Sequence, residues 1–407
     1  MEEINEELCW RRKVIRLMLK GLRPCDILKR VPRGREWLRK WSKRFTQLGW
    51  LGLQELSRRP ATSPQGYSAQ AHTVVIRVRA ALERRRVGLL GAHAVRQEII
   101  RQRLLRTVPS LTTTKRWLKK AGLTHTDPPQ PVKVYCPQPD WMPDLVLHAM
   151  DWLARYLEGG EKLFVFHSVD AQTRALAQTI SRDKTVATVR RHLLETWQEL
   201  GLPHRLQLDN DAAFNGGERT PRRFGTVVRL CLYFGIEPVF LPPGEPKRNS
   251  LVERINGLWV SQFWERNHFS CAKEVVGKQG LFLHWYADQY EPPPLEGLTP
   301  AQMQRRVRRV RLLKQQIRAL PAELPITAGR VHFVRKVSCD GRISFLGESW
   351  KVGKRLAHQY VWATVITHCR RLQIYHQRSE TARWRLIKIF NYELAETICR
   401  LRLEFKR

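Results

Sequence analysis

Three acidic residues, Asp151, Asp209 and Glu253, lie at positions that suit metal chemistry. Asp151 follows an apolar run typical of a strand, Asp209 ends another such run in "LQLDND", and Glu253 opens an expected helix. In phosphoryl transfer, two Mg²⁺ ions about 4 Å apart can activate the attacking oxygen and stabilise the leaving oxygen. Because Mg²⁺ prefers hard oxygen ligands, carboxylates brought to strand ends from separate parts of the chain fit that task.

Each carboxylate also has a purely structural interpretation. Asp151 alone could belong to a turn at a strand end, and Asp170 and Asp211 occupy similar positions in the sequence. Asp170 is expected to cap a turn, while Asp211 is the rival of the first aspartate in "DND". Ser250 and Glu253 match the S-x-x-E capping box, in which the glutamate bonds only the backbone.

The elements expected to position these carboxylates form an α/β layer sandwich. Apolar runs and turn residues within 144–290 predict three strands, a helix, a strand, a helix, a strand and a final helix. This order predicts a mixed five-stranded sheet covered by helices, over about 150 residues. The two aspartates would lie at strands, and Glu253 would lie in the first turn of the last helix.

Two basic helical units are expected before that sheet. Residues 1–58 predict three helices with short breaks, which is typical of a helix-turn-helix DNA-binding domain. Residues 68–122 predict a second such unit, whose last helix begins at the N-cap Ser110. The candidate DNA-binding residues on these units are Arg35, Arg39, Lys40, Lys43, Lys115, Arg116 and Lys119. A small basic helical bundle with a solvated face is the structural alternative.

The remaining segments connect or follow these units. A Pro-rich linker is expected at 123–143, and a basic helix or linker at 291–325, with Thr299 as its N-cap. Short β-rich runs broken by glycines predict a small all-β barrel of five strands at 326–380. A C-terminal tail at 381–407 has a pattern compatible with a helix.

The charge of the chain indicates a polyanionic partner. Its 407 residues carry 72 Lys and Arg against 37 Asp and Glu, a formal net charge of +35. More than half of this net charge lies within residues 1–122. Since 43% of the residues are hydrophobic, the charge belongs to folded domains and not to a basic disordered tail. DNA is the expected partner of the helical units.

Cysteine usage and hydropathy predict a cytoplasmic location, associated with the nucleoid when the protein is bound to DNA. The eight cysteines occur singly, without a CxxC pair or a zinc-binding Cys/His spacing, so we expect reduced and mostly buried thiols. No apolar run reaches transmembrane length, and the opening "MEEINEELCW" is acidic where a signal peptide is basic. We therefore expect no membrane partner.

Taken together, the motifs resemble those of a known family. Asp151 in "MDW", Asp209 in "LDND" and the pattern PKRN-x-x-VER-x-N around Glu253 are similar to the catalytic signature of DDE transposases of bacterial insertion sequences, within the retroviral-integrase superfamily. The resemblance spans nearly the whole chain, from the paired helix-turn-helix units through the core and "GLTPAQM" to the C-terminal β-rich segment. It implies a ribonuclease-H-like fold for the core.

The resemblance also implies a mechanism. Asp151, Asp209 and Glu253 would bind two divalent ions, Mg²⁺ or Mn²⁺. An activated water would nick DNA at the transposon ends, and the freed 3′-hydroxyl would attack target DNA. Assembly as a homo-multimer on DNA is expected, because two ends must be brought together. The chemistry needs no ATP, in agreement with the absence of a GxxxxGK[ST] phosphate loop from the sequence.

Two other functions fit parts of the sequence. A non-catalytic helix-turn-helix regulator derived from a transposase would use the basic units alone, but it has no need for three carboxylates facing DNA. A ribonuclease-H-like nuclease would cut without joining, and the two DNA-reading units fit it less well.

The third carboxylate has a rival in Glu245. Thirty-five residues separate Asp209 from Glu245, the spacing common in the family, whereas forty-three separate it from Glu253. Glu245 stands in a Gly/Pro loop, while Glu253 is expected on a rigid helix that holds ligand geometry better. A lengthened loop at 215–225 accounts for the eight extra residues, so we assign the role to Glu253.

Basic residues beside Glu253 are candidate DNA contacts near the site. Lys247, Arg248 and Arg254 would meet phosphates there. For each of them, solvated surface charge is the structural alternative.

Overall fold

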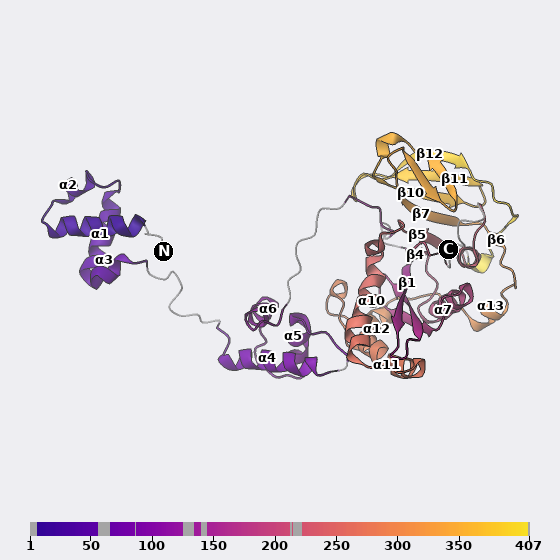
Figure 1. The fold of residues 1–407 in the computed structure, drawn as a ribbon, viewed down its shortest axis with the longest axis horizontal. Coiled ribbons are helices and arrows are strands. Elements are labelled where there is room, and N and C mark those ends of the chain that lie inside the picture. The colour runs from indigo at the N-terminus through magenta and orange to yellow at the C-terminus, as the bar shows by residue number, and fades with distance from the viewer. Residues whose placement is uncertain are drawn as a thin grey trace. The chain divides into compact units, whose positions relative to one another are not determined.

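The structure is a computed structural model that describes residues 6–55, 66–85, 87–124, 134–139, 145–211, 214 and 222–405, with the side chains of 246, 247 and 403 excepted. The chain divides into two compact units, Met1–Ser68 and Ala69–Arg407 (Figure 1). Within the described residues, no helix is long and apolar enough to cross a membrane.

The first unit is a three-helix domain, as the sequence predicts. It contains α1 (Glu6–Leu19), α2 (Pro24–Leu28) and α3 (Arg35–Leu48), followed by the 3₁₀ helix η1 (Gly49–Leu53). The break after α1 has Gly21 at a φ of +80°, and Pro24 opens α2 at a position where its missing N–H is not needed. Trp41 of α3 is buried, and the Arg11 guanidinium stacks 3.8 Å from the centroid of its ring.

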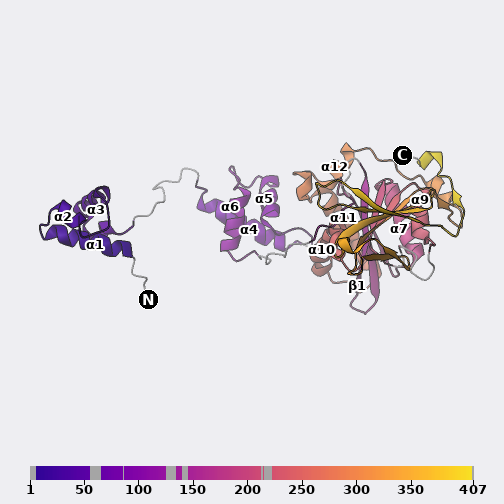
Figure 2. The same cartoon turned by 90° about the horizontal axis from the view of Figure 1, so that it is seen from above.

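A second group of three helices, labelled in Figure 2, opens the larger unit, which begins at Ala69. It consists of α4 (Ala69–Glu83), α5 (Ala92–Arg101) and α6 (Leu111–Lys120). The predicted N-cap is confirmed, because the Ser110 hydroxyl accepts a hydrogen bond of 3.2 Å from the backbone N–H of Thr113. Val75, Val95 and Leu118, one from each helix, are fully buried and pack in one cluster.

Five strands of the main sheet form the predicted mixed core. They lie in the order β3-β2-β1-β4-β5, with β1 antiparallel to β2 and parallel to β4. Their bounds are β1 (Leu147–Tyr156), β2 (Lys162–Asp170), β3 (Leu176–Ser181), β4 (Arg205–Leu208) and β5 (Glu237–Phe240). The central strands are buried on both faces, as expected where helices cover a sheet on both sides.

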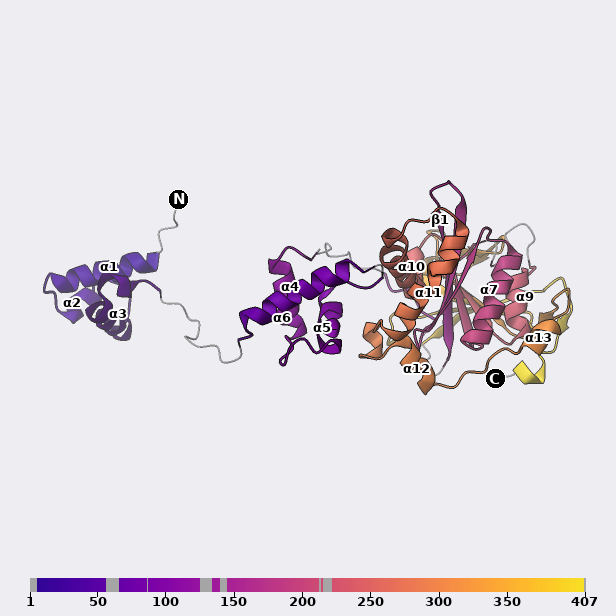
Figure 3. The same ribbon diagram turned by 90° about the horizontal axis from the view of Figure 1, so that it is seen from below.

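Helices pack on both faces of this sheet (Figure 3). Neighbouring residues on a strand point to opposite faces, so Met150 packs with α7 and α9, while Ala149 packs with α10 and α11. The four helices are α7 (Val186–Glu199), α9 (Thr226–Tyr233), α10 (Ser250–Gln262) and α11 (Ala272–Asp288). Short 3₁₀ turns follow α10 and α11, namely η3 (Trp264–Arg266) and η4 (Pro293–Leu295).

The C-terminal β-rich segment is not the separate barrel that the sequence predicts. Its strands extend the core sheet to nine strands, because β7 pairs in parallel with β5 at Val239↔His332 (Figure 1). If β5 were an edge strand, its outer backbone N–H and C=O groups would be unpaired, and the pairing with β7 provides them with partners. The added strands are β7 (Arg330–Lys336), β10 (Tyr360–Ile366), β11 (Arg371–His376) and β12 (Arg385–Asn391), and β12 lies in the segment predicted as a tail.

Smaller elements complete this C-terminal part. Two further two-stranded sheets are not hydrogen-bonded into the main sheet. One is the hairpin of β8 (Arg342–Phe345) and β9 (Glu348–Lys351), and the other is the pair formed by β6 (Ile326–Thr327) and β13 (Ile398–Cys399). Two 3₁₀ turns, η5 (Lys354–Leu356) and η6 (Leu403–Phe405), follow β9 and β13.

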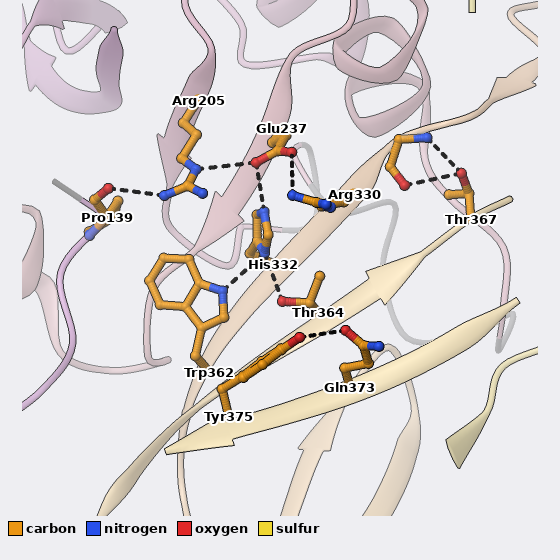
Figure 4. A network of polar contacts seen from close by, with 11 residues as sticks. Pro139, Arg205, Glu237, Arg330, His332, Trp362, Thr364, Thr367, Gln373 and Tyr375 are labelled. Atoms are coloured by element: carbon orange, nitrogen blue, oxygen red, sulfur yellow. Dashed lines mark hydrogen bonds and ion pairs between the residues drawn. The ribbon is translucent and has the colours of Figure 1, made fainter. Parts of the chain in front are cut away.

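A buried polar network joins the two parts of the sheet (Figure 4). Glu237 on β5 accepts hydrogen bonds from Arg205 Nε at 3.2 Å and from His332 Nε2 at 3.0 Å. The Trp362 indole N–H donates to the other ring nitrogen of His332 at 3.0 Å. Burial alone would raise the pKa of Glu237, but His332 and Arg205 outweigh it and lower the pKa to about 2. The network therefore links β4, β5, β7 and β10 around one ionised carboxylate.

The basic segment at 291–325 differs from the single helix that its sequence suggests. Thr299 forms the predicted N-cap, with a full capping box, for α12 (Pro300–Arg306), but the helix then stops. Residues 307–313 run in an extended form, with Leu202 N–H donating to Val310 O at 2.7 Å, before α13 (Lys314–Arg318). Contacts with the core thus outweigh local helix propensity.

The cysteines are unpaired, as predicted, but most of them are not buried. All eight are free, and only Cys136 and Cys231 are buried. In the Pro-rich linker predicted at 123–143, the described residues 134–139 form neither helix nor strand, and most of the other linker residues lie outside the part of the chain that the structure describes.

Candidate active site

The strand register brings the two predicted aspartates side by side. β1 and β4 are parallel neighbours with Ala149 opposite Gln207. Two residues further along each strand direction, Asp151 on β1 lies level with Asp209, which directly follows β4. Two carboxyl groups that are distant in the sequence therefore lie close together where β4 ends beside β1.

Glu253 reaches the same place from the first turn of α10. Val252, Ile255 and Trp259 of this helix are buried against the face of the sheet that carries Ala149. This packing fixes the rotation of the helix about its axis and so directs the position of Glu253.

The pKa of Asp151 reflects the proximity of the carboxylates of Asp209 and Glu253. Burial is the largest cause that raises its pKa to about 7, and the negative charges of Asp209 and Glu253 raise it further. Hydrogen bonds from the backbone N–H of Trp152 at 2.8 Å and from Asn256 at 3.0 Å act in the opposite direction. The three predicted site residues therefore share one electrostatic environment.

The rival aspartates have other roles. Asp211 forms an ion pair of 2.7 Å with Lys184. Its backbone N–H donates to Asp209 Oδ1 at 3.0 Å, while burial raises the pKa of Asp209. Asp170 caps its own turn by accepting hydrogen bonds from the backbone N–H groups of Gln172 and Thr173, as predicted.

The capping box proposed for Ser250 and Glu253 is not formed. Asn249 is the N-cap of α10 and makes no side-chain cap hydrogen bond, and Ser250 is the first residue of the helix. The helix therefore begins one residue earlier than the S-x-x-E box requires, with Asn249 and not Ser250 at the N-cap.

Glu245 is engaged elsewhere. It accepts hydrogen bonds from the Tyr360 hydroxyl at 2.6 Å and from Arg248 Nε at 3.0 Å. Burial would raise its pKa, but these two bonds outweigh burial and lower it. Glu245 thus ties the turn η2 (Pro246–Asn249) to β10. The loop at 215–225, to which the extra residues were assigned, lies largely outside the described residues.

Two residues that the sequence reasoning did not assign to the site orient Asp151. Asn256 donates from Nδ2 to Asp151 Oδ2 at 3.0 Å, and its Oδ1 lies 2.7 Å from His167 Nδ1. His167 is fully buried, and burial lowers its pKa to about 4, so the neutral ring donates to Asn256 near pH 7. The spacing of Asn256 three residues after Glu253 places both on one helix face, which was the available signal.

Asn249 is a further buried contact at the start of α10. Its Nδ2 donates to the Met150 carbonyl at 3.1 Å, and its Oδ1 accepts from Gln207 Nε2 at 2.8 Å. Asn249 and Gln207 are each less than 5% exposed. One side chain therefore joins the start of the Glu253 helix to β1, which carries Asp151, and to β4, which directly precedes Asp209.

The predicted DNA-binding residues differ in their availability. The seven on the helical units are exposed, namely Arg35, Arg39, Lys40, Lys43, Lys115, Arg116 and Lys119. Arg254 on α10 is also exposed. Arg248 bonds Glu245 and Tyr360, and its side chain is only 16% exposed. The Lys247 side chain lies outside the described residues.

The donor set fits a divalent cation chemically. It consists of carboxylate oxygens. Burial and then the charges of Asp209 and Glu253 raise the pKa of Asp151, and a bound cation would relieve the repulsion among these charges. Among the described residues, no group of three or more Asp, Glu, His or Cys side chains is placed to enclose one ion. Mg²⁺ is usually held by one or two carboxylates together with substrate phosphates, so carboxylate pairs suffice.

Comparison with known proteins finds a partial similarity to a retroviral polyprotein. No family model matches the chain. Over 121 residues, 30% of this chain, it is 32% identical to the Gag-Pro-Pol polyprotein of bovine leukemia virus, and the match spans 8% of that polyprotein.

Similar solved structures include retroviral integrases. The HTLV-2 integrase catalytic core domain in complex with magnesium is 18% identical, with a TM-score of 0.28 over 39% of this chain and 95% of that one. The simian T-cell lymphotropic virus intasome in complex with a PP2A regulatory subunit is 13% identical, with a TM-score of 0.32 over 75% of this chain and 96% of that one. None of these matches names a bacterial insertion sequence.

Proposed function

We propose that the chain is a DDE-type transposase, a metal-dependent polynucleotidyl transferase that cleaves DNA at transposon ends and joins them to target DNA. The observation that carries this proposal is the convergence of Asp151, Asp209 and Glu253, whose charges act on one another in a partly buried site. The net charge of +35 carried by the whole chain suits a polyanionic substrate. The partial similarity to a retroviral Gag-Pro-Pol polyprotein supports it.

The three carboxylates would hold the divalent ions. When bound, Mg²⁺ or Mn²⁺ supplies Lewis acidity towards the phosphate and lowers the pKa of the attacking water. Asn256 holds one oxygen of Asp151, and the neutral His167 holds Asn256, so the carboxylate stays in one orientation. Asn249 keeps the Glu253 helix in register with both aspartates.

DNA would be bound mainly outside this site. The exposed basic residues of α3 and α6 suit phosphate and base contacts of the helix-turn-helix type, and Arg254 lies one residue from Glu253. Because two DNA ends must be joined to one target, we propose that the active form is a homo-multimer on DNA. The chemistry would need no ATP.

A joining assay tests this function. Purified protein is incubated with Mg²⁺ or Mn²⁺ and labelled oligonucleotides that carry the element's ends, and nicked and joined products are separated on a gel. Asp151→Asn and Asp209→Asn remove one negative charge each at nearly constant size, so both are expected to abolish nicking and joining while end binding persists. End binding without any metal-dependent nicking by the wild type would favour the non-catalytic regulator, and nicking without joining would favour a nuclease.

A further inference from the structure

The C-terminal part of the sheet touches the turn that carries Asp209. Arg335 on β7 is 6% exposed and donates from Nη2 to Asn210 Oδ1 at 2.6 Å. Asn210 directly follows Asp209 in the sequence. A side chain more than a hundred residues away in the sequence thus contacts the neighbour of a proposed metal ligand.

The contact belongs to a closed set of hydrogen bonds. Arg335 Nη1 donates to the Leu241 carbonyl at 3.0 Å, and Asn210 Nδ2 donates to the same carbonyl. The Leu241 N–H donates in turn to the Leu208 carbonyl at 3.0 Å. The backbone is therefore held on both sides of Asp209, at Leu208 and at Asn210.

Arg335 occupies a place where an apolar side chain would be expected. Burial of a guanidinium carries a large desolvation penalty unless its donors are satisfied. The Arg335 N–H groups donate to the Asn210, Leu241 and Ser344 oxygens, the last at 3.1 Å, so the guanidinium has a defined orientation. A buried, hydrogen-bonded guanidinium of this kind adds little to the stability of the fold, so we infer that its role is to fix the position of the groups it contacts.

A second contact connects the same strands with the Glu253 helix. Tyr360 on β10 is 4% exposed and donates to Glu245, while Arg248 donates to the Tyr360 hydroxyl at 3.2 Å. Glu245 directly precedes the turn η2 and Arg248 lies within it, and this turn leads directly into α10. The added strands therefore contact two of the three segments that carry the candidate ligands.

We propose that Arg335 is a positioning residue for Asp209, so that the C-terminal sheet extension is part of the catalytic module. Through Asn210, Arg335 would hold the turn in the conformation in which Asp209 binds a divalent cation. Groups that orient metal ligands in this way commonly change metal affinity or activity by about 10- to 100-fold when removed. This inference rests on the proposed function of Asp209.

Metal binding provides a test that does not depend on catalysis. Mn²⁺ binding to the full chain is measured by electron paramagnetic resonance for the wild type, Arg335→Met, Asn210→Ala and the double variant. Arg371→Met is the matched control, because Arg371 is exposed on β11 of the same sheet. We expect each single variant to raise the apparent Kd about 10-fold, the double variant to be no weaker than either, and the control to match the wild type. The concentration of Mg²⁺ that gives half-maximal nicking should shift in parallel.

The outcomes separate this inference from the proposed function. Wild-type Mn²⁺ affinity in folded Arg335→Met and Asn210→Ala overturns the inference, as does a wild type that binds no Mn²⁺. If Arg335→Met fails to fold, Asn210→Ala alone decides, because Asn210 is only half-buried. The expected binding pattern in a protein that does not nick DNA would support the positioning role and contradict the proposed reaction.

Discussion

Asp151 carries the strongest electrostatic effect in the candidate site. Burial, with two carboxylates nearby, moves its pKa to about 7, so the metal-free protein holds a proton there at pH values where a free aspartate is ionised. Without a metal, the cluster of three carboxylates thus destabilises the folded state, whereas a bound cation would offset the repulsion among them. Function and not folding explains why three carboxylates meet at this point.

This raised pKa predicts a pH-dependent stability without metal. The folded state keeps its proton between the ordinary aspartate pKa of 3.8 and about 7, while the unfolded state releases it, so the contribution of Asp151 to stability falls as pH rises through that window. Asp151→Asn removes the effect, which amounts to at most about 4 kcal/mol. We expect the variant to gain in Tm over the wild type at pH 8 but little at pH 4, measured by thermal unfolding in EDTA. An equal gain at both pH values would contradict the raised pKa.

The orientation of Asp151 could not be predicted from its own position. The sequence correctly places Asp209 directly after a strand and Glu253 in the first turn of a helix, because strand ends and helix starts leave clear local signals, whereas Asp151, expected to follow its strand, lies in the middle of β1. It does not show that Asn256 turns towards Asp151, since the side chain's direction depends on a buried histidine on β2. Arg248, expected at DNA, instead bonds a strand that lies more than a hundred residues later.

At the scale of elements, the start of α10 decides where Glu253 lies. Asn249 replaces a conventional N-cap with two contacts to the sheet, one to the Met150 carbonyl and one to Gln207. The Asn249 side chain thereby joins the start of α10 to β1 and β4 instead of accepting a hydrogen bond from the helix backbone.

Asn249→Ala and Ser250→Ala therefore have different expected effects. Asn249→Ala leaves a buried amide and a buried carbonyl without partners, which costs about 1–3 kcal/mol, and it should lower the nicking rate as well. Ser250 is exposed and caps nothing, so its alanine variant should stay within about 0.5 kcal/mol of the wild type. Chemical denaturation of both variants measures this. A larger loss for Ser250→Ala would restore the capping-box interpretation.

Most helices and strands follow from local patterns, and the exceptions have long-range causes. Three-helix periodicity, the Ser110 and Thr299 caps and the core strand order all appear in the structure. The basic helix after Thr299 ends early because residues 307–313 bond the core, for example at Leu202. The periodicity of the sequence reports only helix propensity and does not show that hydrogen bonds to the core will outweigh it.

At the scale of the whole molecule, basic helices and an acidic site belong to one chain. The basic residues of α3 and α6 are exposed, as the proposed phosphate contacts require, while the carboxylates suit the proposed metal binding. The nine-stranded sheet could not be predicted, because the pairing of β5 with β7 joins segments about ninety residues apart and depends on the buried Glu237 network.

The proposed DNA surface predicts a change in salt dependence. Replacement of Arg39 and Lys43 on α3 by Gln should weaken binding to all DNA sequences and reduce the slope of log K against log salt by about 0.9 per lost phosphate contact. Arg12→Gln on the exposed face of α1 is the matched control. Fluorescence anisotropy over a salt series provides both values. An unchanged slope in the α3 variant would contradict the assignment of that helix to DNA.

The choice between Glu253 and Glu245 tests the central claim most directly. In the joining assay with Mg²⁺, we expect Glu253→Gln to lose at least about 100-fold in rate, the scale of losing one transition-state contact, while it still binds the ends. Glu245→Gln keeps the size of the side chain, and its amide oxygen can still accept from Tyr360 and Arg248, so its rate should stay within about fivefold of the wild type. Loss of joining in Glu245→Gln with activity retained in Glu253→Gln would contradict the proposed active site.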